Sequence, residues 1–258
     1  MKMRKISRRQ FIAASLLAAP ALVLADTKIE PTWLKVRHVR IGPAKPTCRL
    51  VHFTDVHHKG DTSYLQTVIN HINRLSPDFV CFTGDIMEDG RYLKEALELF
   101  AEIKTPLYGV PGNHDYWSRA SFGVIQKSFA ATGGGWLLDQ TRKVGSDINL
   151  IGITCTHNRP QQLPHDPARK NIVLMHYPAW VKEFAGQKFD LLLAGHSHGG
   201  QVRIPFYGPL IVPYLVDQYD LGLYQTDAGP LYVNAGIGYI GHYSFRFNCH
   251  PEITLVEV

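Results

Sequence analysis

Side chains that could bind metal ions follow five short apolar runs of this sequence. They comprise two pairs separated by one residue and three single residues: Asp55 and His57, Asp85, Asn113, His176, and His196 and His198. Carboxylate, amide and imidazole groups together make a mixed oxygen and nitrogen donor set without thiolate. Such a set suits Mn, Fe or Zn in an open hydrolytic site and argues against a closed structural zinc site.

These seven ligands are too many for one ion that keeps a coordination position free for a substrate. They fit two divalent or trivalent ions about 3.5–4 Å apart with a carboxylate between them. Two such cations could hold the oxygens of a phosphate group, offset its charge and supply a metal-bound hydroxide at neutral pH. The donor set therefore predicts a dinuclear site for phosphoester hydrolysis and leaves the choice among Mn, Fe and Zn open.

The apolar runs before these residues have the length of buried strands. Between the early runs, apolar residues recur at helical spacing over 65–75 and 93–103, and 121–135 predicts a weaker helix that ends in glycines. The second half of the chain is richer in strands. We expect an α/β protein in which two mixed sheets pack face to face with helices outside, and in which strand ends carry the ligands.

Each ligand pair has one residue between its members. Alternate residues of an extended backbone point to the same side. We therefore expect an extended backbone at both pairs, so that Asp55 and His57 bind from one side and His196 and His198 do the same.

Taken in order, the blocks Asp55-x-His57, Gly84-Asp85, Gly112-Asn113-His114-Asp115, His176 and Gly195-His196-x-His198 resemble those of the calcineurin-like metallophosphoesterase superfamily. The resemblance extends from about Arg49 to Val258. It implies a four-layer sandwich in which two mixed sheets are flanked by helices, in agreement with the pattern of strands. It also implies that one ion is held by Asp55, His57, Asp85 and His198, and the other by Asp85, Asn113, His176 and His196.

The same resemblance makes His114 the residue that binds phosphate and protonates the leaving oxygen. A carboxylate is expected to support this histidine, and the sequence offers Glu88, Asp89 and Asp115 without deciding among them. His58, which follows the first ligand pair, is interpreted as a residue at the rim of the site.

The segments "GHSHGGQVRIP" and "RFNCHPEITL" resemble a narrower branch of small exported or membrane-associated bacterial phosphoesterases. Some members of that branch, or close to it, are linked to cleavage of UDP-2,3-diacylglucosamine in lipid A synthesis, and others to the cell envelope.

The first residues predict an export signal. The run Ser7-Arg8-Arg9-Gln10-Phe11-Ile12 looks like a twin-arginine signal, and the apolar stretch that ends at Leu24 is short for a membrane span of about 20 residues. We expect a signal at 1–25, a linker or edge segment at 26–48 and a catalytic domain at 49–258. An ordinary secretory signal or an uncleaved anchor is the alternative. The expected location is the periplasm or cell envelope, reached through the twin-arginine machinery.

The formal charge of +5 is concentrated at the N-terminus, and no basic stripe with interleaved aromatics follows, so we expect no nucleic-acid partner. Four cysteines lie far apart without a CxxC motif. Cys81 and Cys155 stand within apolar runs, which favours buried free thiols.

Two further features bear on the substrate. The segment 204–219 is rich in aromatic and aliphatic residues and contains three prolines. We expect it to cover the core, the alternative being an apolar rim for a lipid-bearing substrate or a membrane surface. Arg246 could bind a distal phosphate or form a structural ion pair.

The sequence thus predicts an exported, dinuclear metal-dependent phosphoesterase. Because little of the chain is left for a lid domain, an open site is expected, which favours a phosphodiester or pyrophosphate of a lipid-linked or cell-envelope substrate. The alternatives are a UDP-2,3-diacylglucosamine pyrophosphatase of lipid A biosynthesis and, from another class, a non-catalytic metal-binding interaction module.

Overall fold

The computed structural model describes residues 27, 29–42, 45–156, 162–184, 186–241 and 244–258. The predicted signal at 1–25 lies outside the described residues. In the part of the chain that the structure describes, no helix combines the length and apolarity needed to cross a bilayer.

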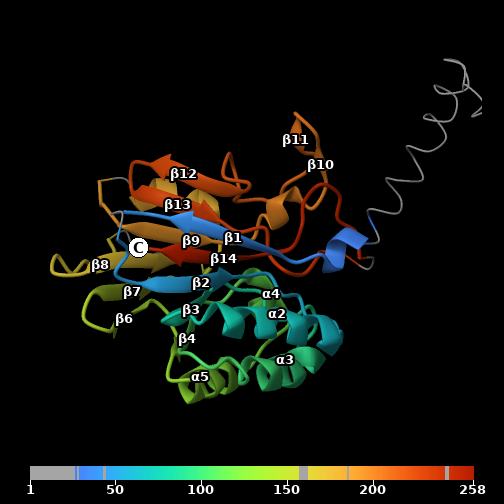
Figure 1. Cartoon of the computed structure of the whole chain (residues 1–258), viewed down its shortest axis with the longest axis horizontal. Helices are drawn as coiled ribbons and strands as arrows, with labels where there is room; N and C mark the ends of the chain where they lie inside the picture. Colours follow the sequence, from blue (N-terminus) through green and yellow to red (C-terminus); the bar gives the residue numbers. More distant parts are fainter. Residues whose placement is uncertain (1–26, 28, 43–44, 157–161, 185, 242–243) are drawn as a thin grey trace, which may run out of the picture.

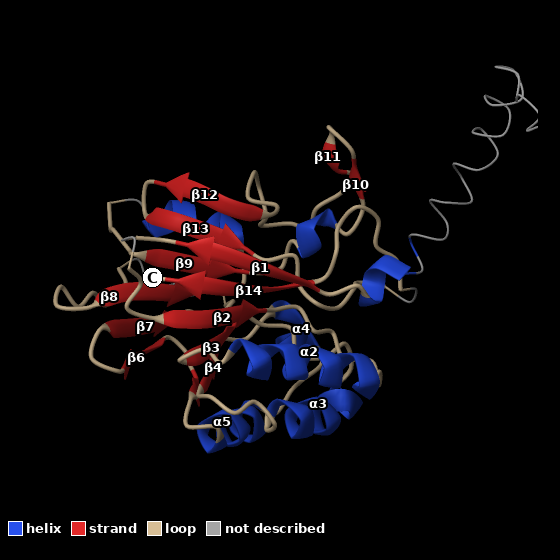
Figure 2. Ribbon diagram, in the orientation of Figure 1, coloured by secondary structure: helices blue, strands red, loops and turns tan. Residues whose placement is uncertain are grey.

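Two six-stranded mixed sheets form the body of the molecule, as Figures 1 and 2 show. The first has the order β1 (Lys35–Arg40), β14 (Glu252–Glu257), β2 (Arg49–Phe53), β3 (Phe79–Phe82), β4 (Leu107–Gly109) and β5 (Gly135–Trp136). Strands β2 to β5 run parallel, whereas β14 is antiparallel to β2 and parallel to β1. The segment 26–48 therefore supplies an edge strand of this sheet.

The second sheet has the order β12 (Gly222–Thr226), β13 (Gly229–Val233), β9 (Leu191–Ala194), β8 (Lys170–Leu174), β7 (Ile148–Gly152) and β6 (Gln140–Val144). Its four central strands are parallel, and both edge strands pair antiparallel. A short hairpin, β10 (Arg203–Ile204) and β11 (Gly208–Pro209), stands away from both sheets at the top of Figure 1.

Helices cover the outer face of the first sheet. They are α2 (Thr62–Leu75), α3 (Leu93–Phe100) and α5 (Phe122–Ala131), which lie together below that sheet in Figure 2. Helix α2 begins where the Asp61 side chain accepts the N–H of Tyr64, and it ends at Ser76 in a left-handed conformation. Short turns complete the elements: η1 (Glu30–Thr32), η2 (Gly90–Tyr92), α4 (Asn113–Trp117), η3 (Pro178–Phe184) and η4 (His198–Gly200).

Three apolar cores follow from the alternation of side chains along the strands. Leu50 of β2 and Leu193 of β9 lie in the central core between the two sheets. Their neighbours point outward: Val51 packs with the helices, and Leu192 packs with η3. Because both faces of each sheet are buried, these strands appear in the sequence as continuous apolar runs.

The predicted fold class is confirmed: two multi-strand mixed sheets pack together with helices on the outside. The three helices expected at 65–75, 93–103 and 121–135 are α2, α3 and α5. All four cysteines are described and are free thiols, with Cys81 buried and Cys155 partly exposed.

Candidate metal centre

The predicted ligands converge from both sheets. They follow β2, β3, β4, β8 and β9, so that loops at the carboxyl ends of parallel strands bring together residues up to 143 positions apart. Two of the clusters suited to a metal ion are Asp55, His57 and His198, and Asp85, His176 and His196. These two sets divide His196 from His198 in the way that the family resemblance implies.

The backbone at these positions is left-handed, so the expectation of an extended backbone is wrong. Positive φ angles occur at five ligands: Asp55 (52°), His57 (42°), Asp85 (64°), His196 (67°) and His198 (49°). A non-glycine residue in this region costs about 1–2 kcal/mol. The chain turns sharply as it leaves each strand, and hydrogen bonds between the loops hold the turns. One of them runs from the His196 N–H to Asp55 Oδ2 over 2.9 Å.

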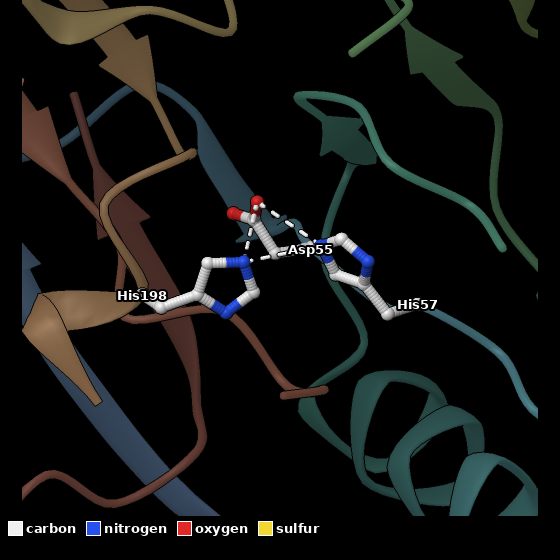
Figure 3. A group of neighbouring side chains, drawn as sticks. All are labelled: Asp55, His57 and His198. Atoms are coloured by element: carbon white, nitrogen blue, oxygen red, sulfur yellow. Dashed lines mark hydrogen bonds and ion pairs between the residues drawn. The ribbon is translucent and has the colours of Figure 1, made fainter. Parts of the chain in front are cut away.

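In the first cluster the side chains point toward one another, as Figure 3 shows. His198 Nε2 lies 3.4 Å from Asp55 Oδ1 and 3.1 Å from His57 Nε2. Two ligands bound at right angles to an ion, each at about 2.1 Å, would be about 3 Å apart. The spacing of the two imidazole nitrogens therefore fits a shared ion.

Asp85 stands between the two clusters. Its Oδ2 atom is 3.3 Å from His57 Nε2 in the first cluster and 3.3 Å from His176 Nε2 in the second. Asn113 Oδ1 approaches the same His176 nitrogen at 2.9 Å. One carboxylate oxygen thus faces ligands of both clusters, which is the arrangement that a bridging ligand needs.

The outer ring nitrogens fix the tautomers of three histidines. His57 Nδ1 lies 2.8 Å from Glu88, His176 Nδ1 lies 2.7 Å from the Thr83 carbonyl, and His196 Nε2 lies 2.8 Å from the Tyr214 carbonyl. Because carbonyl and carboxylate oxygens accept, each outer nitrogen carries the proton. When the ring is neutral, the inner nitrogen presents its lone pair to the cluster, as in metal-ligating histidines.

The carboxylate and imidazole groups of the centre shift one another's pKa values. Burial alone would raise the pKa of Asp85, but His176 and His57 outweigh it and hold that pKa well below its usual range. Burial lowers the pKa values of His57 and His176, yet their contacts with Asp85 raise both to about 9. Burial, with His176 beside it, lowers the pKa of His196 to about 3. Protons on His57 and His176 therefore offset the carboxylates, and a metal ion has to displace them.

His114 lies at the open edge of the centre. Its side chain is 18% exposed, and its ring centroid is 4.5 Å from that of His57 and 4.9 Å from that of Trp117. Glu88 Oε2 lies 3.4 Å from His114 Nδ1 and 2.8 Å from His57 Nδ1. Because Nδ1 faces the carboxylate, Nε2 is the ring nitrogen left for contact with a substrate.

The other two carboxylates considered for His114 have different partners. Asp115 is fully buried and accepts the backbone N–H groups of Asp85, Ile86 and Gly112 at 2.8–2.9 Å. It holds two ligand loops together, and burial with the nearby charge of Asp85 raises its pKa to about 7. Asp89 is half-exposed and caps η2 through the N–H of Arg91. Of the three candidates, only Glu88 lies beside the His114 side chain.

Two glycines permit the close approach of the ligand loops. A Cβ atom on Gly112 would lie 2.1 Å from Asp85 Oδ1, and one on Gly195 would lie 2.4 Å from Asp55 Oδ2. Both contacts are shorter than any side chain allows. The glycines beside the ligands in the sequence are therefore part of the geometry of the centre.

Two expectations about the surroundings are wrong, and a third holds for only part of its segment. His58 is buried and bonds to Glu95 of α3, so it does not lie on the rim. Arg246 is fully buried and donates to the carbonyls of Ala235, Gly238 and Cys249, so it binds neither a distal phosphate nor a carboxylate in the described part of the chain. Most of 204–214 is exposed and does not cover the core, whereas Leu215 and Tyr219 pack against the core that contains η3.

Supports that act through backbone atoms, such as the carbonyls of Thr83 and Tyr214, leave no signal in the sequence. A buried contact from the N-terminal segment was missed as well. The Glu30 carboxylate accepts the N–H groups of Asn248 and Cys249, and Cys249 Sγ donates to the carbonyl of His198 at 3.3 Å.

Residues 48–200 match the family of calcineurin-like phosphoesterases. The chain belongs to this family. It is 30% identical to an uncharacterized metallophosphoesterase of Bacillus subtilis, YkuE, over 98% of both chains. It is 24% identical to the phosphodiesterase YaeI of Escherichia coli over 98% of this chain and 99% of that one. It is also 25% identical to the UDP-2,3-diacylglucosamine pyrophosphatase LpxG of Chlamydia trachomatis over 94% and 95%.

The family membership and the two clusters together make the chain a metal-dependent phosphoesterase. The donor set and the ligand spacing suit two ions.

Proposed function

We propose that the protein hydrolyses a phosphodiester or pyrophosphate bond in a lipid-linked or cell-envelope substrate at a membrane surface outside the cytoplasm. The observation that carries this proposal is an exposed, uncharged loop whose base is bonded to a predicted metal ligand. The family resemblance supplies the reaction, and the loop supplies the class of substrate.

Asp55, His57 and His198 would hold one ion and Asn113, His176 and His196 the other, with Asp85 shared between them. When bound, Mn, Fe or Zn would supply Lewis acidity and a nucleophile from water. His114 Nε2 then donates a proton to the leaving oxygen, because Nδ1 faces Glu88. Glu88 orients His114, and Asp115 holds the loops that carry the bridging aspartate and His114.

The loop from Ile204 to Val216 contains no charged residue. Six of its large apolar side chains are exposed: Ile204, Phe206, Tyr207, Leu210, Ile211 and Tyr214. Phe206 is fully exposed, and Tyr214 is 86% exposed. Contiguous apolar surface of this kind marks a contact with a membrane or a protein partner.

Ion pairs hold the base of the loop at both ends. Arg203 pairs with Asp220 at 2.5 Å, and Lys182 pairs with Asp217. Three prolines restrict the backbone between these pairs. The apolar side chains are thus presented on a restrained scaffold, and they support membrane-surface contact by this enzyme.

A second candidate is hydrolysis of UDP-2,3-diacylglucosamine. The similarity to a chlamydial enzyme of that name favours it, because that substrate combines a pyrophosphate bond with two acyl chains. A cleaved export signal at 1–25 would separate the enzyme from cytoplasmic nucleotide sugars, so this candidate needs an uncleaved anchor that leaves the domain inside. The proposal of a non-catalytic module has less support, because every predicted ligand and His114 are present and converge.

The test is a screen of the protein without residues 1–25 in Mn²⁺, Fe²⁺ or Zn²⁺. The substrates are a phosphomonoester, a phosphodiester, a nucleotide sugar and an isoprenoid pyrophosphate. We expect the last three to be turned over faster than the monoester, and Asp85→Ala and His114→Ala to abolish the activity. Turnover of monoesters alone would refute the substrate class, and activity that survives Asp85→Ala would refute the shared carboxylate.

A further inference from the structure

A groove of about 360 Å³ opens beside the second ligand cluster. Five aromatic residues supply most of its wall: Tyr116, Trp117, Tyr177, Trp180 and Tyr214. The predicted ligand Asn113 also lines it, so the groove begins at the metal centre. A space of this size can enclose a substituent as large as a small-molecule ligand. We refer to it as the aromatic groove.

Two rings of the aromatic groove pack against the proposed proton donor and against a predicted metal ligand. The Trp117 centroid is 4.9 Å from that of His114, and the Tyr177 centroid is 4.6 Å from that of His196. Tyr177 also packs edge-on against Trp180, which is buried and lines the groove as well. A substituent in the aromatic groove would therefore belong to the same molecule as a phosphate at the metal centre.

The lining of the aromatic groove is neutral. The described residues that line it include no Asp, Glu, Lys, Arg or His, and the non-aromatic ones include Cys155, Thr156 and Leu215. A second phosphate or a carboxylate would lose its hydration there without gaining a counter-charge. The occupant is therefore an uncharged part of the substrate.

Tyr214 connects the aromatic groove with the exposed loop. Tyr214 lines the groove at the point where its carbonyl meets His196, and the residues before it in the chain are the apolar ones at 204–212. A single planar base would fill the groove and make no use of this outer surface. A hydrocarbon chain could lie in the groove and continue along the loop, so that one occupant accounts for both features.

We propose that the aromatic groove binds a hydrocarbon chain of the substrate and that Tyr214 and Trp180 select for its length. This inference rests on the proposed function, because it places the apolar part of that substrate. What it adds is a location for the hydrocarbon chain, on the side of the metal centre where Asn113 lies.

The test uses alkyl p-nitrophenyl phosphodiesters from methyl to octyl, kept below micelle-forming concentrations in Mn²⁺. Each methylene that enters an apolar site is worth about 0.8 kcal/mol, or about fourfold in kcat/KM. We expect this rise with each carbon until the aromatic groove is filled. A flat series in an active enzyme would overturn the proposal, as would strong discrimination among nucleoside p-nitrophenyl esters.

Two variants locate the effect. Tyr214→Ser removes the ring of a lining residue but keeps the carbonyl that binds His196. Thr156→Trp instead adds a large side chain at a lining position and so fills the groove. Both should reduce the octyl-to-methyl ratio of kcat/KM at least tenfold. Tyr207→Ser is the matched control, because Tyr207 is an exposed tyrosine of the same loop that does not line the aromatic groove. An equal loss in the control would overturn the assignment to the groove.

Binding of alkylphosphonates to the same variants, measured by calorimetry with Mn²⁺, separates this inference from the proposed function. If no diester is hydrolysed, the proposed function fails. A Kd that still falls with chain length in the wild type and not in Tyr214→Ser would then support the groove. A Kd independent of chain length would overturn it.

Discussion

Replacement of Glu88 by glutamine tests whether one carboxylate serves both a metal ligand and the proton donor. Glu88 Oε2 faces His57 Nδ1 at 2.8 Å and His114 Nδ1 at 3.4 Å. The amide of Gln keeps the size of the side chain but loses the negative charge. Its one carbonyl oxygen makes only a neutral hydrogen bond with either ring.

A hydrogen bond to a charged group contributes about 1.5–3 kcal/mol, which corresponds to roughly 10–150-fold. The Glu88 side chain is 32% exposed, so solvent screens the charge and the lower part of this range applies. Loss of an outer partner of a ligating histidine typically costs about 10–100-fold in metal affinity or activity. We therefore expect Glu88→Gln to lower kcat/KM about 10–30-fold and to weaken metal retention by a similar factor.

The assay measures initial rates on a phosphodiester with saturating Mn²⁺, and metal content after dialysis against a graded chelator. Asp89→Asn is the control, because it neutralises the adjacent carboxylate, which is half-exposed and caps η2. Asp89→Asn should change neither quantity more than twofold. If Glu88→Gln stays within threefold of the wild type in both, the shared role of Glu88 is refuted.

Three further changes have expected outcomes. Gly112→Ala should abolish metal binding and lower the free energy of unfolding by more than 2 kcal/mol, whereas Gly123→Ala, where a Cβ meets nothing within 4 Å, should be neutral or stabilising in thermal unfolding. Burial lowers the pKa of His52 from 6.5 to about 3. Between these two pH values the histidine is therefore protonated in the unfolded chain and neutral in the folded one. The contribution of His52 to stability should fall by about 1.4 kcal/mol per pH unit as pH drops from 6.5 toward 3, and a denaturant series in which His52→Leu keeps the wild-type slope would contradict this. Replacement of both Arg8 and Arg9 by Lys should stop export, as cell fractionation would show; continued export would rule out the twin-arginine route.

Much of the fold was predictable because its physics is local. Strands buried on both faces must be apolar throughout, and α2 must carry apolar residues at Leu65, Val68, Ile69 and Ile72 to cover a sheet. The ligands were visible because metal-binding residue types are rare directly after apolar strands. Their division between two clusters came from the family resemblance, and the clusters agree with it.

What could not be predicted depends on contacts between distant segments. The sequence places Glu88 and Asp89 side by side, and only the fold decides that the first faces His114. Arg246 is buried because carbonyls of remote loops surround it. The left-handed turn at Asp55 has no sequence signature, because period-two alternation holds only while the chain stays in a strand.

The hydrogen bond between the Tyr214 carbonyl and His196 Nε2 makes the apolar loop part of the coordination chemistry. Binding free energies at linked sites are reciprocal: if the ion favours the bonded conformation of the loop, that conformation favours the ion by the same factor. On the proposed function, loss of the ion would loosen the loop, and ordering of the loop by lipid would strengthen binding of the ion. The conformation of the apolar surface and the occupancy of the centre would then be coupled through one carbonyl group.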